Sequence, residues 1–92
     1  MTNELLEIIV STRTDAAGLL IPSLIFINDG LEGPTAYIVD RVIRRDNEII
    51  DGIKTIAYTC LVDVDSKKES FYIRFYPSKD KWFLYKKDFM DI

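Results

Sequence analysis

Carboxylates are the first residues that could do chemistry in this chain, because it contains no histidine and a single cysteine, Cys60. Without histidine, acid–base catalysis would require a pair of carboxylates or a lysine. Asp63 and Asp65 lie two residues apart on a predicted strand, so they share a face and could share a proton or bind a hard cation. We interpret them as a solvated strand end. Asp40 lies within another predicted strand. We interpret it as a surface acid that lies beside Arg41 or beside a basic residue on a neighbouring strand.

Cys60 could act as a nucleophile only as a thiolate with a base nearby. Its neighbours on the same strand face are Tyr58 and Val62, and apolar surroundings raise the pKa of a thiol. We therefore expect a reduced, buried core residue. The glycines form neither a P-loop nor a dinucleotide-binding motif, and Arg44–Arg45 is interpreted as a solvated pair. The sequence thus predicts no enzyme activity, no cofactor and no metal site.

One cluster of residues stands above this background, on the outer face of a predicted hairpin over residues 71–87. Alternation along its two strands already supplies a core, from Phe71, Ile73, Phe75, Trp82 and Leu84. The other face carries a second aromatic row with cations beside it. We predict that this row binds a partner, through Tyr72, Arg74, Tyr76, Lys81, Phe83 and Tyr85.

Three explanations of the second aromatic row remain open. The C-terminal residues 89–92 could fold back over it. A protein partner or a second copy could bind it, since Tyr and Arg are enriched at interfaces and aromatic patches are rarely exposed without a use. A single-stranded nucleic acid could stack its bases there. The net charge of −3 and the absence of an RNP-type motif count against nucleic acid.

The sequence therefore predicts a non-enzymatic interaction module, accessory or inhibitor-like, that binds a protein partner or itself. Tyr72 and Tyr85 are expected to supply flat contact area, Arg74 a hydrogen-bonding fork and Phe83 a buried anchor. The alternative function is single-stranded nucleic-acid binding on the same face.

The elements that must position these residues are strands, because the dominant apolar period is two. Turn residues are predicted at Asp51–Gly52, 65–68 and 77–80. Strands are predicted over Leu24–Ile27, Thr35–Arg44, Lys54–Val64, Phe71–Tyr76 and Lys81–Lys86. Residues 48–50 form either a short return strand or one helical turn. Residues 4–10 fit a helix or a strand, and their β-branched content favours the strand.

The expected hairpin register follows from an even loop length between the last two strands. It places Phe75 opposite Trp82 and Ile73 opposite Leu84 on the core face. On the other face it pairs Tyr72 with Tyr85, Arg74 with Phe83, and Tyr76 with Lys81.

The predicted fold is a single all-β domain spanning residues 1–92. Five to six strands joined by short loops indicate a small antiparallel barrel or rolled sheet, with SH3-like or OB-like closure and at most one short helical turn. An exposed edge of the N-terminal strand would also allow a homodimer to form by strand pairing.

Charge and hydropathy indicate where the chain works. Residues 1–52 carry nine acids and four bases, whereas residues 53–92 carry six acids and eight bases, so an anionic partner would meet the C-terminal half. No signal-peptide pattern is visible, and the longest uncharged stretch, 16–28, is too short to span a membrane. We expect a cytoplasmic protein without membrane contact.

Three short patterns carry a family resemblance. Tyr37-x-x-Asp40-x-Val42, Tyr58-Thr59-Cys60 and Trp82-Phe83 resemble short uncharacterised all-β proteins of Gram-positive bacteria and their mobile elements. The resemblance covers about the last two-thirds of the chain and implies a small cytoplasmic β domain without catalytic activity. A small acidic inhibitor encoded by a phage or plasmid would have the same features.

Overall fold

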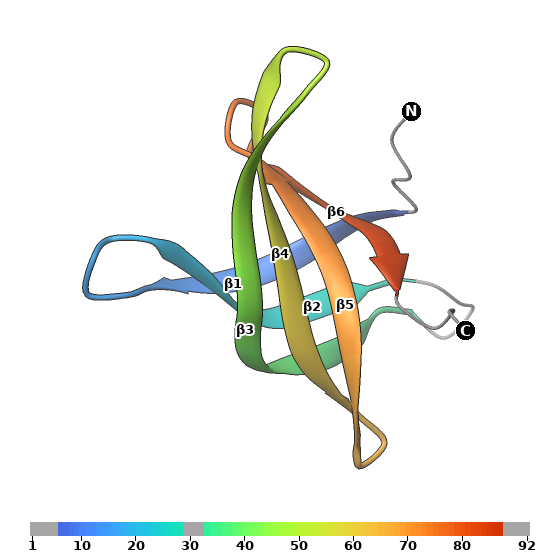
Figure 1. Ribbon diagram of the computed structural model, residues 1–92. Coiled ribbons are helices and arrows are strands. Elements are labelled where there is room, and N and C mark those ends of the chain that lie inside the picture. Colours follow the sequence, from blue (N-terminus) through green and yellow to red (C-terminus); the bar gives the residue numbers. More distant parts are fainter. Residues whose placement is uncertain (1–5, 29–32, 88–92) are drawn as a thin grey trace.

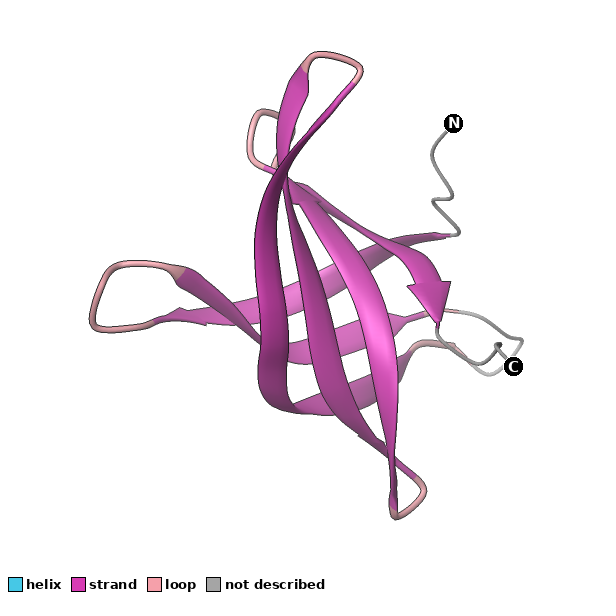
Figure 2. Ribbon diagram, viewed as in Figure 1, coloured by secondary structure: helices cyan, strands magenta, loops and turns pink. Residues whose placement is uncertain are grey.

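The structure, a computed structural model, describes residues 6–28 and 33–87 of the chain (Figure 1). Its six strands are β1 (Leu6–Thr14), β2 (Leu20–Ile27), β3 (Thr35–Ile50), β4 (Ile53–Val64), β5 (Lys67–Tyr76) and β6 (Lys81–Lys87). Each strand pairs antiparallel with the next, and β6 pairs with β1 to close a barrel. Figure 2 shows strands joined by loops, and the described residues contain no helix. The predicted small antiparallel barrel is confirmed, and its strand order is that of an up-and-down barrel.

The N-terminal segment is a strand over its described part, as its β-branched residues favoured. Residues 4 and 5 lie outside the described residues. Strand β2 begins at Leu20 rather than at Leu24, so Pro22 lies inside it. Pro22 is accommodated because the β1–β2 register shifts there, which leaves Ser23 as an extra residue. The Ser23 hydroxyl donates a hydrogen bond of 3.0 Å to the Ser11 carbonyl across the shift.

The predicted end of the next strand at Arg44 was wrong. Strand β3 runs on to Ile50 without a return strand or a helical turn, because Asp46 and Asn47 pair with Ala57 and Ile56 of β4. Polar residues do not end a strand when their backbone groups still find partners across the ladder. The hairpin turns at Asp51–Gly52, where both residues have positive φ, as a two-residue type I′ turn requires.

Strand β3 belongs to two differently oriented parts of the barrel. It pairs with β2 only over Thr35–Ile38, and its register with β4 shifts between Val39 and Arg41 and again between Val42 and Arg44. Register shifts bend a strand and increase its twist. In Figure 1, β1 and β2 accordingly run across the direction of β4 and β5. The bend gives the outside of the barrel two differently oriented faces, one on β1–β3 and one on β4–β6.

The core lies inside the barrel and contains the inward residues of every strand. The five core residues predicted from the last hairpin are confirmed, since all of them are buried: Phe71, Ile73, Phe75, Trp82 and Leu84. Tyr58 is buried beside Trp82, and its hydroxyl donates a 2.9 Å hydrogen bond to the Leu20 carbonyl. A buried hydroxyl that keeps a partner avoids the cost of desolvation.

The barrel closes over a short ladder in which Leu6–Ile8 pair with Trp82–Leu84. Strand β6 therefore covers the beginning of the N-terminal edge that strand-pairing dimerisation would have used. Within the described ranges, the chain holds no helix that is long and apolar enough to cross a membrane.

Candidate functional site

The hairpin of β5 and β6 brings the predicted binding residues together on one outer face, as expected from alternation. Phe75 faces Trp82 and Ile73 faces Leu84 on the core side. On the outer side Arg74 faces Phe83 and Tyr76 faces Lys81. These four predicted pairs are confirmed. The remaining pair, Tyr72 with Tyr85, was wrong in its register.

A register shift between Tyr72 and Ile73 is the reason, because it places Lys86 rather than Tyr85 opposite Tyr72. The two tyrosine rings nevertheless approach each other, with centroids 6.3 Å apart and planes inclined by 33°. An extra residue in one strand changes backbone pairing while leaving neighbouring side chains within reach. Tyr72 and Tyr85 are both partly exposed.

Arg74 is buried in this face, not exposed on it as a hydrogen-bonding fork. Arg74 is 7% exposed. Its Nη1 lies 2.8 Å from the Glu48 carboxylate and 2.8 Å from the Thr55 hydroxyl. Its guanidinium also lies 4.6 Å from the centre of the Tyr85 ring. The small side chain of Ala57, directly opposite Arg74, leaves room for the guanidinium to cross β4 and reach Glu48 on β3. Arg74 therefore holds three strands and one aromatic ring in place.

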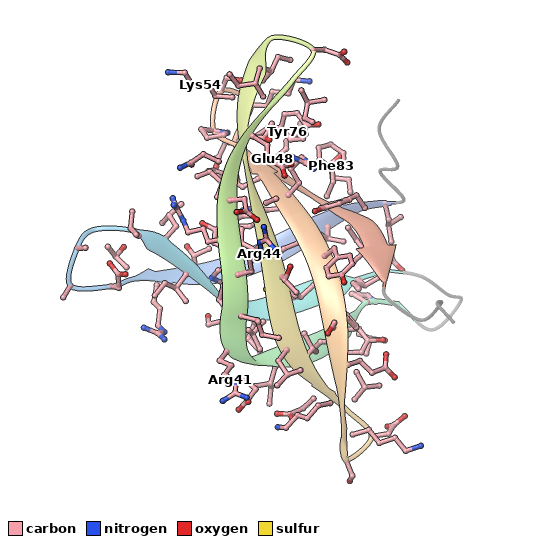
Figure 3. All side chains as sticks on the ribbon, viewed as in Figure 1. Arg41, Arg44, Glu48, Lys54, Tyr76 and Phe83 are labelled. Carbon is pink, nitrogen blue, oxygen red and sulfur yellow. The ribbon has the colours of Figure 1, made fainter. Side chains whose placement is uncertain are left out.

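Tyr76 is buried as well, at 5% exposure. The Phe83 ring meets it edge-on at 5.5 Å, and the Lys79 ammonium lies 5.2 Å from its centre. Lys81, opposite Tyr76, forms an ion pair of 3.0 Å with Glu7 of β1. Figure 3 shows Glu48, Tyr76 and Phe83 together near one end of β5. Two of the predicted binding residues, Arg74 and Tyr76, thus belong to the support of the face.

On this outer face, the aromatic residues that are partly exposed to solvent are Tyr72, Phe83 and Tyr85, which we call the aromatic platform. Burial raises the pKa of the Tyr85 phenol, an effect that the nearby Arg74 charge partly offsets. The hydroxyl is therefore neutral in the physiological range and can donate a hydrogen bond. The platform residues carry no charge, and Arg74 holds the Tyr85 ring in place.

Sequence reasoning missed Glu48, which compensates the Arg74 charge, and Thr55, which accepts a hydrogen bond from it. It left residues 48–50 unassigned between a return strand and a helical turn. Had the strand been continued to Asp51–Gly52, the hairpin would have placed Glu48 opposite Thr55, as observed. A two-residue turn read together with its flanking strands was the signal that could have found them.

A hollow of about 460 Å³ opens beside the platform's support, between the tip of the β3–β4 hairpin and the turn that follows β5. Its surface is mostly apolar, although its lining includes the charged residues Glu48 and Lys54. The lining residues are Asn47, Glu48, Ile49, Lys54, Thr55, Ile56 and Pro77.

The candidate chemistry of the acids and the cysteine does not assemble into a site. Asp65 lies in the turn after β4 with a φ of 50°, and Asp63 pairs with Lys68, so the two acids do not face each other as a pair. The Lys68 ammonium on β5 also lies 3.8 Å from the Asp40 carboxylate on β3, so Asp40 has a basic partner on another strand, as predicted. Cys60 is fully buried, and burial raises its thiol pKa to about 12.

The two arginines interpreted as a solvated pair differ from each other. Arg44 is exposed and bonds to Asp46 at 2.7 Å, whereas Arg45 lies 5.8 Å from the Tyr58 ring with its Nε buried. The described part of the chain contains no group of three acidic or cysteine side chains that could hold a metal ion.

The chain matches no family model, no curated protein and no solved structure. The resemblance to short all-β proteins of Gram-positive bacteria stays a prediction.

Proposed function

We propose that this chain is a non-enzymatic interaction module that binds a protein partner through the aromatic platform on β5 and β6. The observation that supports the proposal is the buried Arg74, whose bonds to Glu48 and Thr55 and contact with Tyr85 fix the platform before any partner arrives. Binding then requires little further ordering of side chains. Such preorganisation lowers the entropic cost of association.

The composition of the platform fits a protein partner. Tyrosine and phenylalanine offer large contact areas with only two side-chain torsions, which makes them efficient anchors. The hollow beside Glu48 and Thr55 offers space for an apolar side chain of the partner next to the platform. Polar groups at its border, such as Lys54, suit the rim of a protein interface.

The charges around the platform disfavour single-stranded nucleic acid. A base-stacking groove needs cations that are available to phosphates. Arg74 and Lys81 instead pair with Glu48 and Glu7, and these acids would lie close to a bound backbone. The nucleic-acid alternative therefore becomes an outcome of the experiment below.

An accessory or inhibitor-like role in a bacterium or its mobile elements completes the proposal, on the basis of the family resemblance. We place the protein in the cytoplasm, because the free, buried thiol of Cys60 suits a reducing compartment.

A tagged capture experiment from host lysate, with and without nuclease, tests the proposal. We expect the wild type to retain a protein that survives nuclease treatment, and Tyr72→Ala/Tyr85→Ala to lose it. Tyr72→Phe/Tyr85→Phe keeps both rings and should retain the partner. Ile43→Ala, which removes an exposed isoleucine of β3, is the control for a surface change elsewhere.

Each contrary outcome is specific. Capture by Tyr72→Ala/Tyr85→Ala equal to that of the wild type, with cooperative unfolding retained, would show that the platform is not the binding surface. Loss of the captured material on nuclease treatment, together with binding that weakens steeply with salt, would establish the nucleic-acid alternative instead.

A further inference from the structure

The outer face of β1, β2 and the first part of β3 is apolar. Ile9 is 71% exposed and Ile38 is 59% exposed, and the two residues between them on β2 are partly exposed. We call this surface the apolar outer face. It consists of Ile9, Leu24, Phe26, Ala36 and Ile38.

Strand pairing arranges this face in two rows. Ile9, Phe26 and Ala36 are cross-strand partners in the first row. The second row contains Ser11, Leu24 and Ile38. In the first row the bulky Ile9 lies on β1 and the small Ala36 on β3. In the second row the small Ser11 lies on β1 and the bulky Ile38 on β3.

Exposed aliphatic residues are ordinary when they occur singly. A continuous apolar surface across three strands with a charged border is typical of an interaction site. The border beside β1 holds the Glu7–Lys81 ion pair, and the border beside β3 holds Lys68 with Asp40 and Asp63. Each border carries both signs of charge, so acids of one copy can lie beside bases of the other.

We propose that the apolar outer face binds a second copy of this chain, through a two-fold axis that runs along β2. This axis places β2 on β2 and β1 on the second copy's β3. Within the first row, Ile9 then lies over the second copy's Ala36. Within the second row, Ile38 lies over the second copy's Ser11.

The match of bulky to small residues is the physical reason for this choice of occupant. Facing sheets pack well when large side chains of one fill the space above small side chains of the other. A two-fold interface uses the same patch on both copies, so it requires a surface that complements itself. Each row meets that requirement, because it has a bulky residue at one end and a small residue at the other. The apolar outer face contains none of the platform residues Tyr72, Phe83 and Tyr85, so the dimer can be tested separately from the proposed function.

The oligomeric state of the purified chain tests this inference. Light scattering after size exclusion and sedimentation equilibrium, from about 1 µM to about 1 mM, cover weak to moderate affinities. We expect a reversible dimer of twice the 10.7 kDa mass of the chain. A monomer across the whole range overturns the proposal.

Two substitutions distinguish specific packing from general stickiness. Ile38→Lys should raise the dissociation constant of the dimer by about 30-fold or more. Ala36→Trp should also weaken the dimer, because it fills the space that Ile9 of the second copy occupies, although it enlarges the apolar surface. Stronger association of Ala36→Trp overturns the arrangement.

Ile49→Lys is the matched control, because Ile49 is 67% exposed but lies on β3 outside this face. It should leave the dimer intact, as should Tyr85→Ala on the platform. If Ile49→Lys dissociates the dimer as effectively as Ile38→Lys, the dimer uses a different surface and the proposal fails. Thermal unfolding of each variant verifies that the barrel is folded.

Discussion

Arg74 was predicted to contact a partner, but its surroundings make it a buried residue that supports its neighbours. A guanidinium that is largely removed from water requires a carboxylate and further hydrogen bonds to offset its desolvation. Glu48 and Thr55 supply both, at 2.8 Å each, and the Tyr85 ring covers the planar face of the cation. A charge engaged in this way does not readily change partners. In the proposed interaction, the role of Arg74 is to position Tyr85.

Cys60 illustrates the opposite case, in which a reactive group is made inert. Burial raises the pKa of its thiol to about 12, from 9.0. At pH 7 the thiol is protonated in both the folded and the unfolded chain, so it has no effect on stability there. Between pH 9 and 12 only the unfolded chain ionises, and the free energy of unfolding falls as pH rises.

The corresponding measurement compares the wild type with Cys60→Ala by denaturant unfolding across this pH range. Because other groups titrate in both proteins, the difference between them isolates the thiol. We expect the free energy of unfolding of the wild type to fall, relative to that of Cys60→Ala, by up to about 1.4 kcal/mol per pH unit above pH 9. Parallel curves would show that the thiol is not desolvated in the folded chain.

At the scale of elements, the turns decide where strands end. Two of the hairpins use two-residue turns in which both residues have positive φ, Asp51–Gly52 and Asp65–Ser66. Glycine adopts this backbone conformation without steric cost, whereas serine does not. The β4–β5 hairpin therefore carries a strain that the β3–β4 hairpin avoids.

Exchanging the residue type at these two turns tests the argument. We expect Ser66→Gly to stabilise the fold by about 0.5–1 kcal/mol and Gly52→Ser to destabilise it by a similar amount. A Cβ atom at Gly52 would have no heavy atom within 4 Å, so backbone conformation alone would produce the cost. Urea unfolding of both variants gives the two values. A loss of stability in Ser66→Gly would contradict the turn geometry.

The bend in β3 is the other feature that matters at this scale. Two register shifts allow one strand to pair with β2 at its beginning and to extend with β4 beyond the barrel. Glu48, near the end of β3, reaches Arg74, whereas Ile38 lies in the part of β3 that pairs with β2. One strand thus takes part in both candidate interfaces.

At the scale of the whole molecule, the barrel separates a core from two outer faces with different chemistry. Ile8 and Ile9 are adjacent in the sequence, yet Ile8 is 5% exposed and Ile9 is 71% exposed. The closing ladder between β1 and β6 turns Ile8 inward against the core. Ile9 contributes only to the apolar outer face.

Substitution of each isoleucine by alanine separates folding from association. Ile8→Ala should lower the free energy of unfolding by about 2–4 kcal/mol, because it removes packed core atoms. Ile9→Ala should change the unfolding of the monomer by less than about 0.5 kcal/mol. In a dimer, the wild-type melting temperature rises with protein concentration, and Ile9→Ala should reduce that dependence. Equal losses from the two substitutions at low concentration would contradict this division.

The sequence by itself determined the all-β class, the presence of the last three strands and the five core residues of the last hairpin, because alternation and turn residues act locally. It also placed Tyr72, Phe83 and Tyr85 outside the core. Only the tertiary structure decided that the buried Arg74 pairs with Glu48 and that Lys86, not Tyr85, lies opposite Tyr72. It also decided that Ile9 and Ile38 share a face. These features depend on strand bends and on pairing between residues distant in the chain, which local patterns do not encode.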